Sequence, residues 1–252
     1  MNEVLAISLH SMQGDMARLD QIGMNLANVL TPGYKRGVVV QTALASGFAA
    51  HLSSAAALLP DSDVAAAAVH FVADSRAGTL KSTGQGLDLA LAGKGYFEVT
   101  TESGPAYTRH GSFHVDARGR LVTAQGYPVM GTSGEIILNL AHPVVGVTGA
   151  ISSGTDSADA APLAQLKVVQ FGEGAQLEHL GDGLYAAGPG MQILSEQEIQ
   201  VRQGFLENSN ASSSYEMTSL VQAMRHFESM QKIAQGYDEM LGTAIRKLGE
   251  TS

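Results

Sequence analysis

Two long amphipathic helices are predicted at opposite ends of the chain, and the residues between them must fold around this constraint. The first helix covers residues 3–30 and ends at Thr31-Pro32-Gly33, because a residue before proline avoids helical backbone angles and glycine readily enters a turn. The second covers residues 212–248, directly after segment 204–210. The expected fold class is therefore α+β, with long N- and C-terminal helices packed as a coiled-coil module and a central antiparallel β-rich domain.

Apolar residues recur in the first helix at alternating intervals of four and three, the heptad spacing of a helix that packs on other helices. A helix lying on the core of its own domain is the alternative, although it would usually have a wider apolar face. A glycine in the seam weakens an isolated helix by roughly 1 kcal/mol, so we expect stability to come mostly from partners. The seam consists of Leu5, Leu9, Met12, Met16, Leu19, Gly23, Leu26 and Leu30.

The second helix carries a similar seam and is predicted to be roughly 55 Å long, at ~1.5 Å per residue. That length exceeds what a small β domain can cover. Part of the helix is therefore expected to pack on the N-terminal helix or on neighbouring subunits. Its seam consists of Met217, Leu220, Met224, Phe227, Gln231, Ala234, Tyr237, Leu241, Ala244 and Leu248.

The middle of the chain is predicted to be β-rich from residue 80 onward. Apolar residues there alternate with period two, and glycine-containing turns recur about every 8–12 residues, as in antiparallel sandwiches and barrels. Strands are expected at 96–100, 106–109, 112–115, 120–123, 135–140, 144–147, 166–171 and 199–205. The predicted domains are a helical module (1–36 and 205–252), an irregular Ala-rich connector (37–79) and a β-rich outer domain (80–204).

Composition and motifs argue against several classes of function. A net charge of −9, from 15 Lys+Arg and 24 Asp+Glu, does not fit a nucleic-acid-binding surface. The chain contains no cysteine, which excludes disulfides and cysteine-ligated zinc. His110 and His114 are four residues apart, but on a strand this spacing does not bring them together on one metal. No catalytic, cofactor-binding or metal site is predicted, and no small-molecule substrate.

The N-terminus lacks the basic start and apolar run of a secretory signal. No apolar stretch reaches the ~18 residues that a membrane-spanning helix needs. General signals alone therefore predict a soluble cytosolic protein.

Five segments, in the same order along the chain, resemble motifs of the bacterial flagellar axial proteins of rod and hook. Each motif is short, but their order covers most of the chain. They are Asn25-Leu26-Ala27-Asn28 with Thr31-Pro32-Gly33-Tyr34-Lys35; Gly86-Leu87-Asp88-Leu89-Ala90 with Gly95-Tyr96-Phe97; Tyr107-Thr108-Arg109 with Gly111-Ser112-Phe113; Leu121-Val122-Thr123 with Gly126-Tyr127-Pro128-Val129 and Gly131; and Gly204-Phe205-Leu206-Glu207-Asn208-Ser209-Asn210.

The resemblance implies a structural role without enzymatic activity. Subunits would stack helically into a hollow drive shaft across the periplasm, with the terminal helices in the inner tube and the β domain outside. Export would use the flagellar type III apparatus without a cleaved signal peptide, which replaces the cytosolic expectation. Implied partners are other rod proteins, copies of the chain itself, the rod cap and the export apparatus.

Chain length and the C-terminal helix residues Met224-Arg225-His226-Phe227-Glu228 most resemble the proximal-rod branch of this family. The distal-rod branch, or another axial or hook protein, is the alternative. Two rival classes are an enzyme or carbohydrate-binding β protein with a helical dimerisation module, and an adhesin-like filament subunit. The first predicts a concave site with convergent polar groups, and the second needs no motifs at the two helix junctions.

The predicted assembly interface combines the two helix seams with the turn that ends the first helix. It comprises Leu5, Leu9, Met12, Met16, Leu19, Gly23, Leu26, Asn28, Thr31, Pro32, Gly33, Met217, Leu220, Met224, Phe227, Tyr237, Leu241 and Leu248.

Overall fold

The structure is a computed structural model that describes residues 2–41, 69–138, 143–153, 162–172, 175, 177–188 and 190–249 of the 252-residue chain. Most of the predicted Ala-rich connector, residues 42–68, lies outside the described residues. The chain divides into two compact units. We call Met1–Leu26, Val38–Phe71 and Ser213–Ser252 the helical unit, and Ala27–Gly37 with Val72–Ser212 the β unit.

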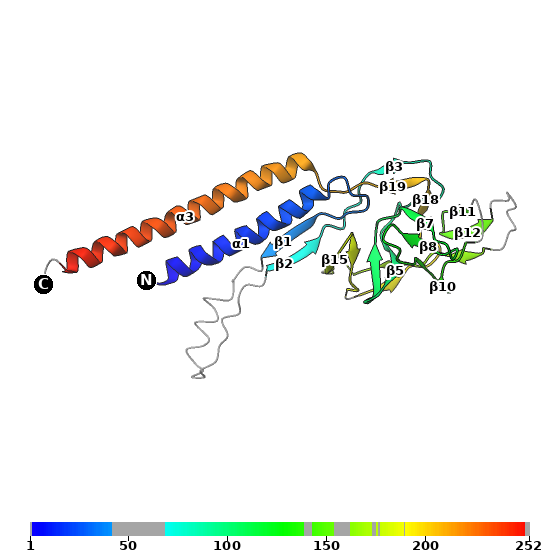
Figure 1. The fold of residues 1–252 in the computed structure, drawn as a ribbon, viewed down its shortest axis with the longest axis horizontal. Coiled ribbons are helices and arrows are strands. Elements are labelled where there is room, and N and C mark those ends of the chain that lie inside the picture. The colour runs from blue at the N-terminus through cyan, green and yellow to red at the C-terminus, as the bar shows by residue number, and fades with distance from the viewer. Residues whose placement is uncertain are drawn as a thin grey trace, which may run out of the picture. The chain divides into compact units, whose positions relative to one another are not determined.

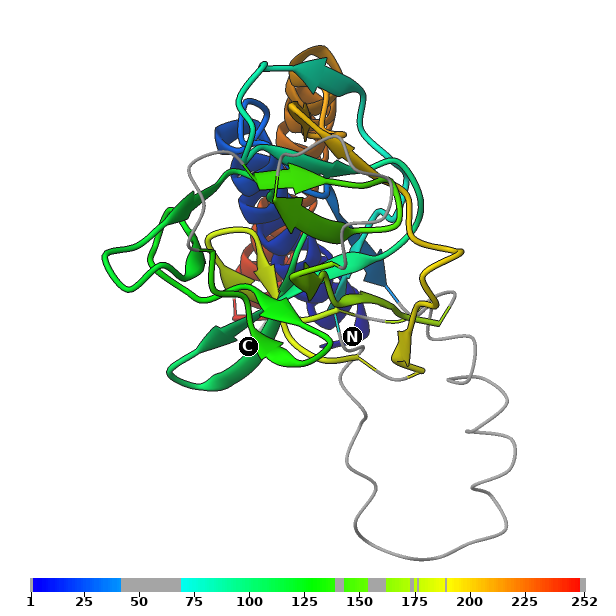
Figure 2. The same ribbon diagram turned by 90° about the vertical axis from the view of Figure 1, so that its right-hand side faces the viewer.

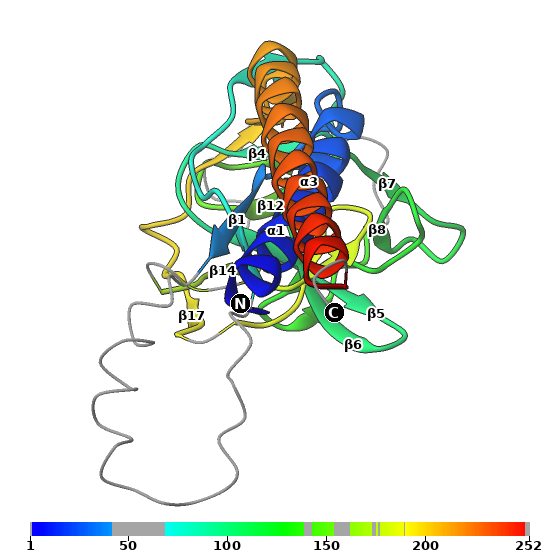
Figure 3. The same ribbon diagram turned by 90° about the vertical axis from the view of Figure 1, so that its left-hand side faces the viewer.

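The helical unit contains α1 (Asn2–Ala27) and α3 (Ser213–Gly249). They run side by side in opposite directions (Figures 1 and 3), and a hydrogen bond joins them, with 2.6 Å between Asp15 Oδ2 and His226 Nδ1. No helix among the described residues is both long and apolar enough to cross a bilayer. Strands β1 (Gly37–Gln41) and β2 (Val69–Ala73) pair as a separate two-stranded sheet.

The predicted fold class, with its coiled-coil module, is wrong. The described residues form two helices against 19 strands, and a coiled coil would bury both apolar positions of each heptad. In α1 only one of the two positions is even partly covered: Met12, Leu19 and Leu26 are half-buried, whereas Leu9, Met16 and Gly23 are exposed. Fully buried positions of α1 are mostly polar instead, namely Ser8, Asp15, Gln21 and Asn25 beside Ile22.

The β unit is built on a six-stranded antiparallel sheet in the order β15-β16-β6-β5-β14-β17. Its centre is the β5–β6 hairpin, which pairs Phe97 with Thr108 and Thr101 with Gly104. The strands are β5 (Tyr96–Thr101), β6 (Gly104–Thr108), β14 (Val168–Gln170), β15 (His179–Gly181), β16 (Leu184–Tyr185) and β17 (Gln192–Ile193).

Smaller antiparallel sheets complete this unit, and their strands run in several directions (Figure 2). The predicted strand 199–205 is interrupted at Gly204, whose φ of 78° breaks the ladder, so that its two halves pair with different partners. The pairs are β7 (Phe113–Val115) with β8 (Leu121–Thr123), β9 (Met130–Gly131) with β10 (Gly134–Glu135), β4 (Leu89–Leu91) with β18 (Val201–Gln203), and β3 (Leu80–Ser82) with β19 (Phe205–Glu207). A three-stranded sheet has β12 (Ala150–Ser153) between β11 (Pro143–Val145) and β13 (Ala164–Gln165).

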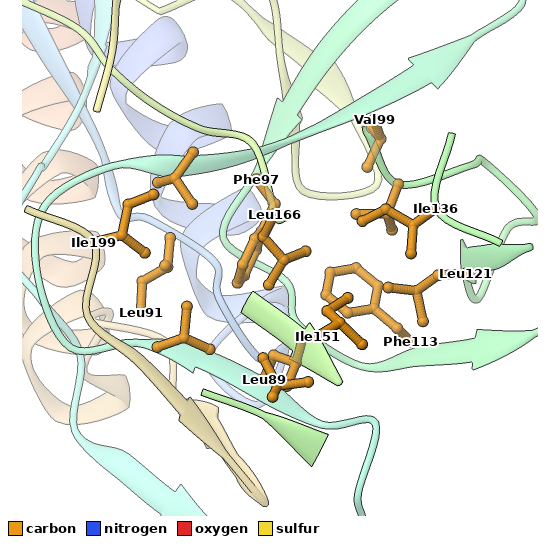
Figure 4. Close-up of a cluster of buried hydrophobic side chains, with 14 of the residues drawn as sticks. Leu89, Leu91, Phe97, Val99, Phe113, Leu121, Ile136, Ile151, Leu166 and Ile199 are labelled. Carbon is orange, nitrogen blue, oxygen red and sulfur yellow. The ribbon is translucent and has the colours of Figure 1, made fainter. Parts of the chain in front are cut away.

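The core of the β unit lies between the central sheet and these smaller sheets (Figure 4). Phe97 and Phe113 pack edge to face, with ring centroids 5.3 Å apart. Around them lie Leu89, Leu91, Val99, Leu121, Ile136, Ile151, Leu166 and Ile199, all buried. A second cluster, on Tyr96, Tyr107, Phe171 and Tyr185, is mainly aromatic.

Candidate functional site

The motifs that follow α1 and precede α3 meet inside the β unit. The Gly33 amide donates to the Glu207 carbonyl at 2.7 Å, and the Asn210 amide donates to the Tyr34 carbonyl at 3.4 Å. The Arg36 amide donates to Asn210 Oδ1 at 2.6 Å. Residues near the two ends of the chain are therefore hydrogen-bonded to each other at the points where the chain enters and leaves the helices.

A third segment, residues 74–79, joins this junction. Asn210 Nδ2 donates to the carbonyls of Asp74 at 3.0 Å and Arg76 at 2.9 Å. Asn208 Nδ2 donates to Thr79 Oγ1 at 2.9 Å, and its backbone amide donates to the Thr79 carbonyl at 2.8 Å. The two asparagines of the C-terminal motif thus hold the chain that leads into β3.

A buried ion cluster of Lys35, Arg109 and Glu207 lies at the centre of the junction. Glu207 Oε1 accepts from Lys35 Nζ at 2.6 Å and from the Gly78 amide at 2.7 Å, and Arg109 Nε lies 3.1 Å from Glu207 Oε2. The three side chains are only 1–3% exposed. Breaking such a pair leaves a buried charge without compensation, which makes each member hard to replace.

The cluster holds two cations and one carboxylate, and burial acts on both cations. Burial lowers the pKa of Lys35, and the positive charge of Arg109 lowers it further, while Glu207 opposes both. Burial likewise lowers the pKa of Arg109. Lys35 Nζ is also bonded to the Arg76 carbonyl at 2.8 Å, so its ammonium has two oxygen partners.

The backbone around the cluster is tightly packed. Gly33 has a φ of 70°, and a Cβ atom there would lie 2.4 Å from the carbonyl carbon of Arg109. Only glycine combines this conformation with this close approach. The Lys35 amide donates to the Tyr185 hydroxyl at 3.3 Å, and burial raises the pKa of that tyrosine.

The predicted interface residues do not all come together. The turn residues Asn28, Thr31 and Pro32 are half-buried, with Thr31 Oγ1 donating to Asn28 Oδ1 at 3.0 Å, while Gly33 belongs to the junction. On the helices, Leu5, Leu241 and Leu248 lie in α1 or α3, but their side chains are outside the described part. The remaining seam residues divide into a half-buried set (Met12, Leu19, Leu26, Leu220, Phe227, Tyr237) and an exposed set (Leu9, Met16, Gly23, Met217, Met224).

The exposed set forms part of an apolar stripe on each helix. Leu9 and Met16 on α1 are both 57% exposed, and Met217, Val221 and Met224 on α3 are 48–53% exposed at the spacing of one helix face. Exposed apolar residues that gather on one face, unlike single scattered ones, indicate an interaction surface. We define these five residues as the exposed stripe.

Sequence reasoning missed the ion cluster. Lys35, Arg109 and Glu207 all lie in motifs that carried the resemblance, but each was an ordinary charged residue beside a turn or strand end. The sequence offers no local signal for the cluster, because Glu207 follows two apolar residues on β19 that are themselves only half-buried, and the fold alone encloses its carboxylate. His114 lies exposed on β7 and His110 in the loop before it, and the described residues contain no group of side chains suited to a metal ion.

Comparison with known proteins gives a consistent result over nearly the whole chain. The family described as "Flagellar hook protein FlgE/F/G D1 domain" matches residues 90–153, and "Flagellar basal body rod FlgEFG protein C-terminal" matches residues 202–247. The chain is 31% identical to the flagellar basal-body rod protein FlgG of Bacillus subtilis, covering 92% of this chain and 94% of the relative. It is 29% identical to the rod protein FlgF of Caulobacter vibrioides (99% of both chains) and 30% identical to that of Escherichia coli (89% of both).

Proposed function

The chain belongs to the flagellar basal-body rod protein family, and from this premise we propose that it is a structural subunit of the rod, polymerised helically as part of the hollow drive shaft. In this role it transmits torque by packing and performs no chemistry. The relatives over nearly its whole length are named as rod proteins, which supports a rod subunit over an enzyme or an adhesin.

The observation that carries the proposal is the exposed stripe on α1 and α3. Leu9, Met16, Met217, Val221 and Met224 present apolar side chains that the helices leave open to solvent. Burying an apolar side chain gains roughly 1.5–3 kcal/mol, so a neighbouring subunit covering the stripe would gain substantial free energy. Contacts of this type between successive copies build an open helical lattice.

The proposed partners are copies of this chain and the rod proteins above and below it, with the rod cap and the type III export apparatus engaged during assembly. Export without a cleaved signal peptide and a final place in the periplasmic rod belong to the same proposal. The relatives include both FlgF and FlgG proteins at about the same identity, so a proximal (FlgF-type) and a distal (FlgG-type) position have equal support.

A charge placed in the stripe tests the role in assembly. In a host strain lacking its own copy of the gene, Met16→Glu should abolish swimming, because an ionised carboxylate cannot be buried in an apolar contact. Gln13→Glu adds the same charge at an exposed polar site of the same helix and should preserve swimming. Normal export of both variants, measured in the culture medium, separates assembly from secretion. Wild-type motility and rods with Met16→Glu would refute the proposal.

Deleting the gene for this chain distinguishes a proximal from a distal position in the rod. Purified basal bodies from the deletion strain can be measured by electron cryomicroscopy. Loss of a proximal subunit should stop the rod at its base, whereas loss of a distal subunit should leave a proximal stub. Rods of full length in the deletion strain would exclude both positions.

A further inference from the structure

A cavity of about 730 Å³ lies beside the ion cluster, entirely within the β unit. Arg109 forms part of its lining, together with Tyr96, Phe171 and Leu177, while Lys94 and Arg76 contribute exposed cationic side chains. The volume is within the range of ~300–1,000 Å³ typical of small-ligand pockets. The cavity thus combines apolar walls with positive charge.

The guanidinium of Arg109 has an unused donor. Its Nη2 atom donates to the Gly93 carbonyl at 2.9 Å, and its Nε atom faces Glu207. Its Nη1 and Nε atoms are both buried without a hydrogen-bond partner among the described residues, and so is Glu207 Oε2, whose 3.1 Å contact with Nε is an ion pair without hydrogen-bond geometry. A buried donor that stays unpaired destabilises a protein, so an oxygen atom from outside the unit would be favoured there.

The net charge of the cluster indicates that the ligand is an anion. Glu207 is the carboxylate that contacts both Lys35 and Arg109, and both of its oxygens already face these cations or the Gly78 amide. Asp74, the other acidic residue on the cavity wall, is held by Arg76 in an ion pair. The cations of the cluster therefore outnumber its carboxylate by one, and Lys94 adds a further cationic side chain to the cavity wall.

The orientation of the Arg109 guanidinium indicates which kind of anion would bind. Arg109 Cζ lies 5.8 Å from the centre of the Tyr96 ring, a stacking contact that holds the planar group in place. A fixed guanidinium edge matches the geometry of a carboxylate. Tyr96, Phe171 and Leu177 would contact a short aliphatic chain.

We propose that this cavity is a binding site for a carboxylate on a short aliphatic chain, with Arg109 as the recognising residue. The carboxylate can come from a free organic acid or from an Asp or Glu side chain of a second copy of this chain, which has a net charge of −9. The free-acid source is independent of the proposed rod function, whereas the second-copy source rests on it.

Binding can be measured on the full-length protein with butyrate as the probe. The Nε–Hε NMR signal of Arg109 should shift saturably with butyrate, but not with n-butanol or with sodium chloride at equal ionic strength. Ala77→Trp places an indole at the cavity wall and should weaken butyrate binding about tenfold or more, because the ligand's contacts are lost. Ala124→Trp, at an exposed turn outside the cavity lining, is the matched control and should bind normally.

Arg109→Lys keeps the charge but removes the planar fork, and it should also weaken binding about tenfold. If that variant does not fold, Ala77→Trp still decides the question. No saturable shift with butyrate, equal binding by Ala77→Trp, or tighter binding of inorganic phosphate than of butyrate would each overturn the carboxylate site.

The source of the carboxylate follows from sedimentation velocity of the same samples. If butyrate and Ala77→Trp both reduce self-association, the side chain of a second copy occupies the cavity. If butyrate binds and self-association does not change, a free acid is the ligand. The carboxylate site stands in both cases, and Met16→Glu, which lies outside the cavity, tests the rod role separately.

Discussion

The β unit and the helical unit differ in the kind of residue that they bury most completely. In the β unit, Phe97, Val99 and Leu166 are completely buried, and even the charges of the ion cluster are enclosed with partners. In the helical unit, Asp15 and Asn25 are buried, while Leu9 and Met16 lie open to solvent. The comparison indicates that the β unit contains its own stabilising core, whereas the helices keep apolar surface available for other molecules.

This difference separates two kinds of residue that look alike in the sequence. In the β unit, apolar residues that alternate along a strand include the buried core residues. On the helices, apolar residues at heptad spacing include residues exposed for contact with other molecules. Most charged residues of the described chain are solvated, whereas those of the junction are buried in the ion cluster and stabilise the fold.

The largest effect is expected for Glu207→Gln. Removing the carboxylate leaves Lys35 and Arg109 as two buried cations without an anion, which typically destabilises by about 3–5 kcal/mol. Glu102→Gln, at the exposed tip of the β5–β6 hairpin, should change stability by less than about 0.5 kcal/mol. Urea unfolding followed by circular dichroism measures both. A loss below about 1 kcal/mol for Glu207→Gln would mean that the cluster is not structural.

The same truncation in the two units gives the most direct comparison. Leu166→Ala removes a fully buried side chain from the core of the β unit and should cost about 2–5 kcal/mol. Leu9→Ala removes a side chain that is 57% exposed and should leave the monomer's unfolding free energy nearly unchanged. It should instead reduce incorporation into rods. Similar losses of monomer stability for both variants would contradict the division between the units.

Gly33→Ala should have a smaller but definite effect of about 1–3 kcal/mol, because the residue has a φ of 70° and its new Cβ would meet the Arg109 backbone. Gly84 provides a matched control, since its φ is 71° and the space around it is open. Gly84→Ala should show only the conformational penalty, about 1 kcal/mol. Thermal unfolding of the two variants measures the difference, and equal losses would show that close packing at Gly33 is unimportant.

The features predictable from the sequence are the local ones. The presence and approximate extent of α1 and α3 follow from apolar spacing, although α1 ends at Ala27 and not at the predicted residue 30, and the β5–β6 hairpin follows from alternation and a glycine turn. The coiled-coil interpretation failed because heptad spacing does not say what covers each position. Met12 and Leu9 belong to the same seam, yet one is half-buried and the other exposed.

The ion cluster was not predictable because it is nonlocal. Lys35 and Glu207 are 172 residues apart, and their segments are brought together by backbone hydrogen bonds such as that of Gly33 with Glu207 and by the bonds of Asn210. The interruption at Gly204 was missed for a related reason. Phe205 continues the apolar alternation, and its pairing with Ser82, not its own sequence, assigns it to a different sheet.

The smallest effect is a pH dependence of the β unit that arises at His110. Burial lowers the pKa of this histidine below 6.5, with Asp88 opposing the shift. Between the lowered folded value and 6.5 the unfolded chain binds more protons, so the stability of the β unit should fall as the pH decreases through this window. His110→Gln removes the group and should flatten the slope of unfolding free energy against pH. His114→Gln, at an exposed position on β7, should keep the wild-type slope. Because His110 lies in the β unit, the change should appear in the near-ultraviolet signal of the β-unit tyrosines, and an unchanged slope in His110→Gln would assign the pH dependence elsewhere.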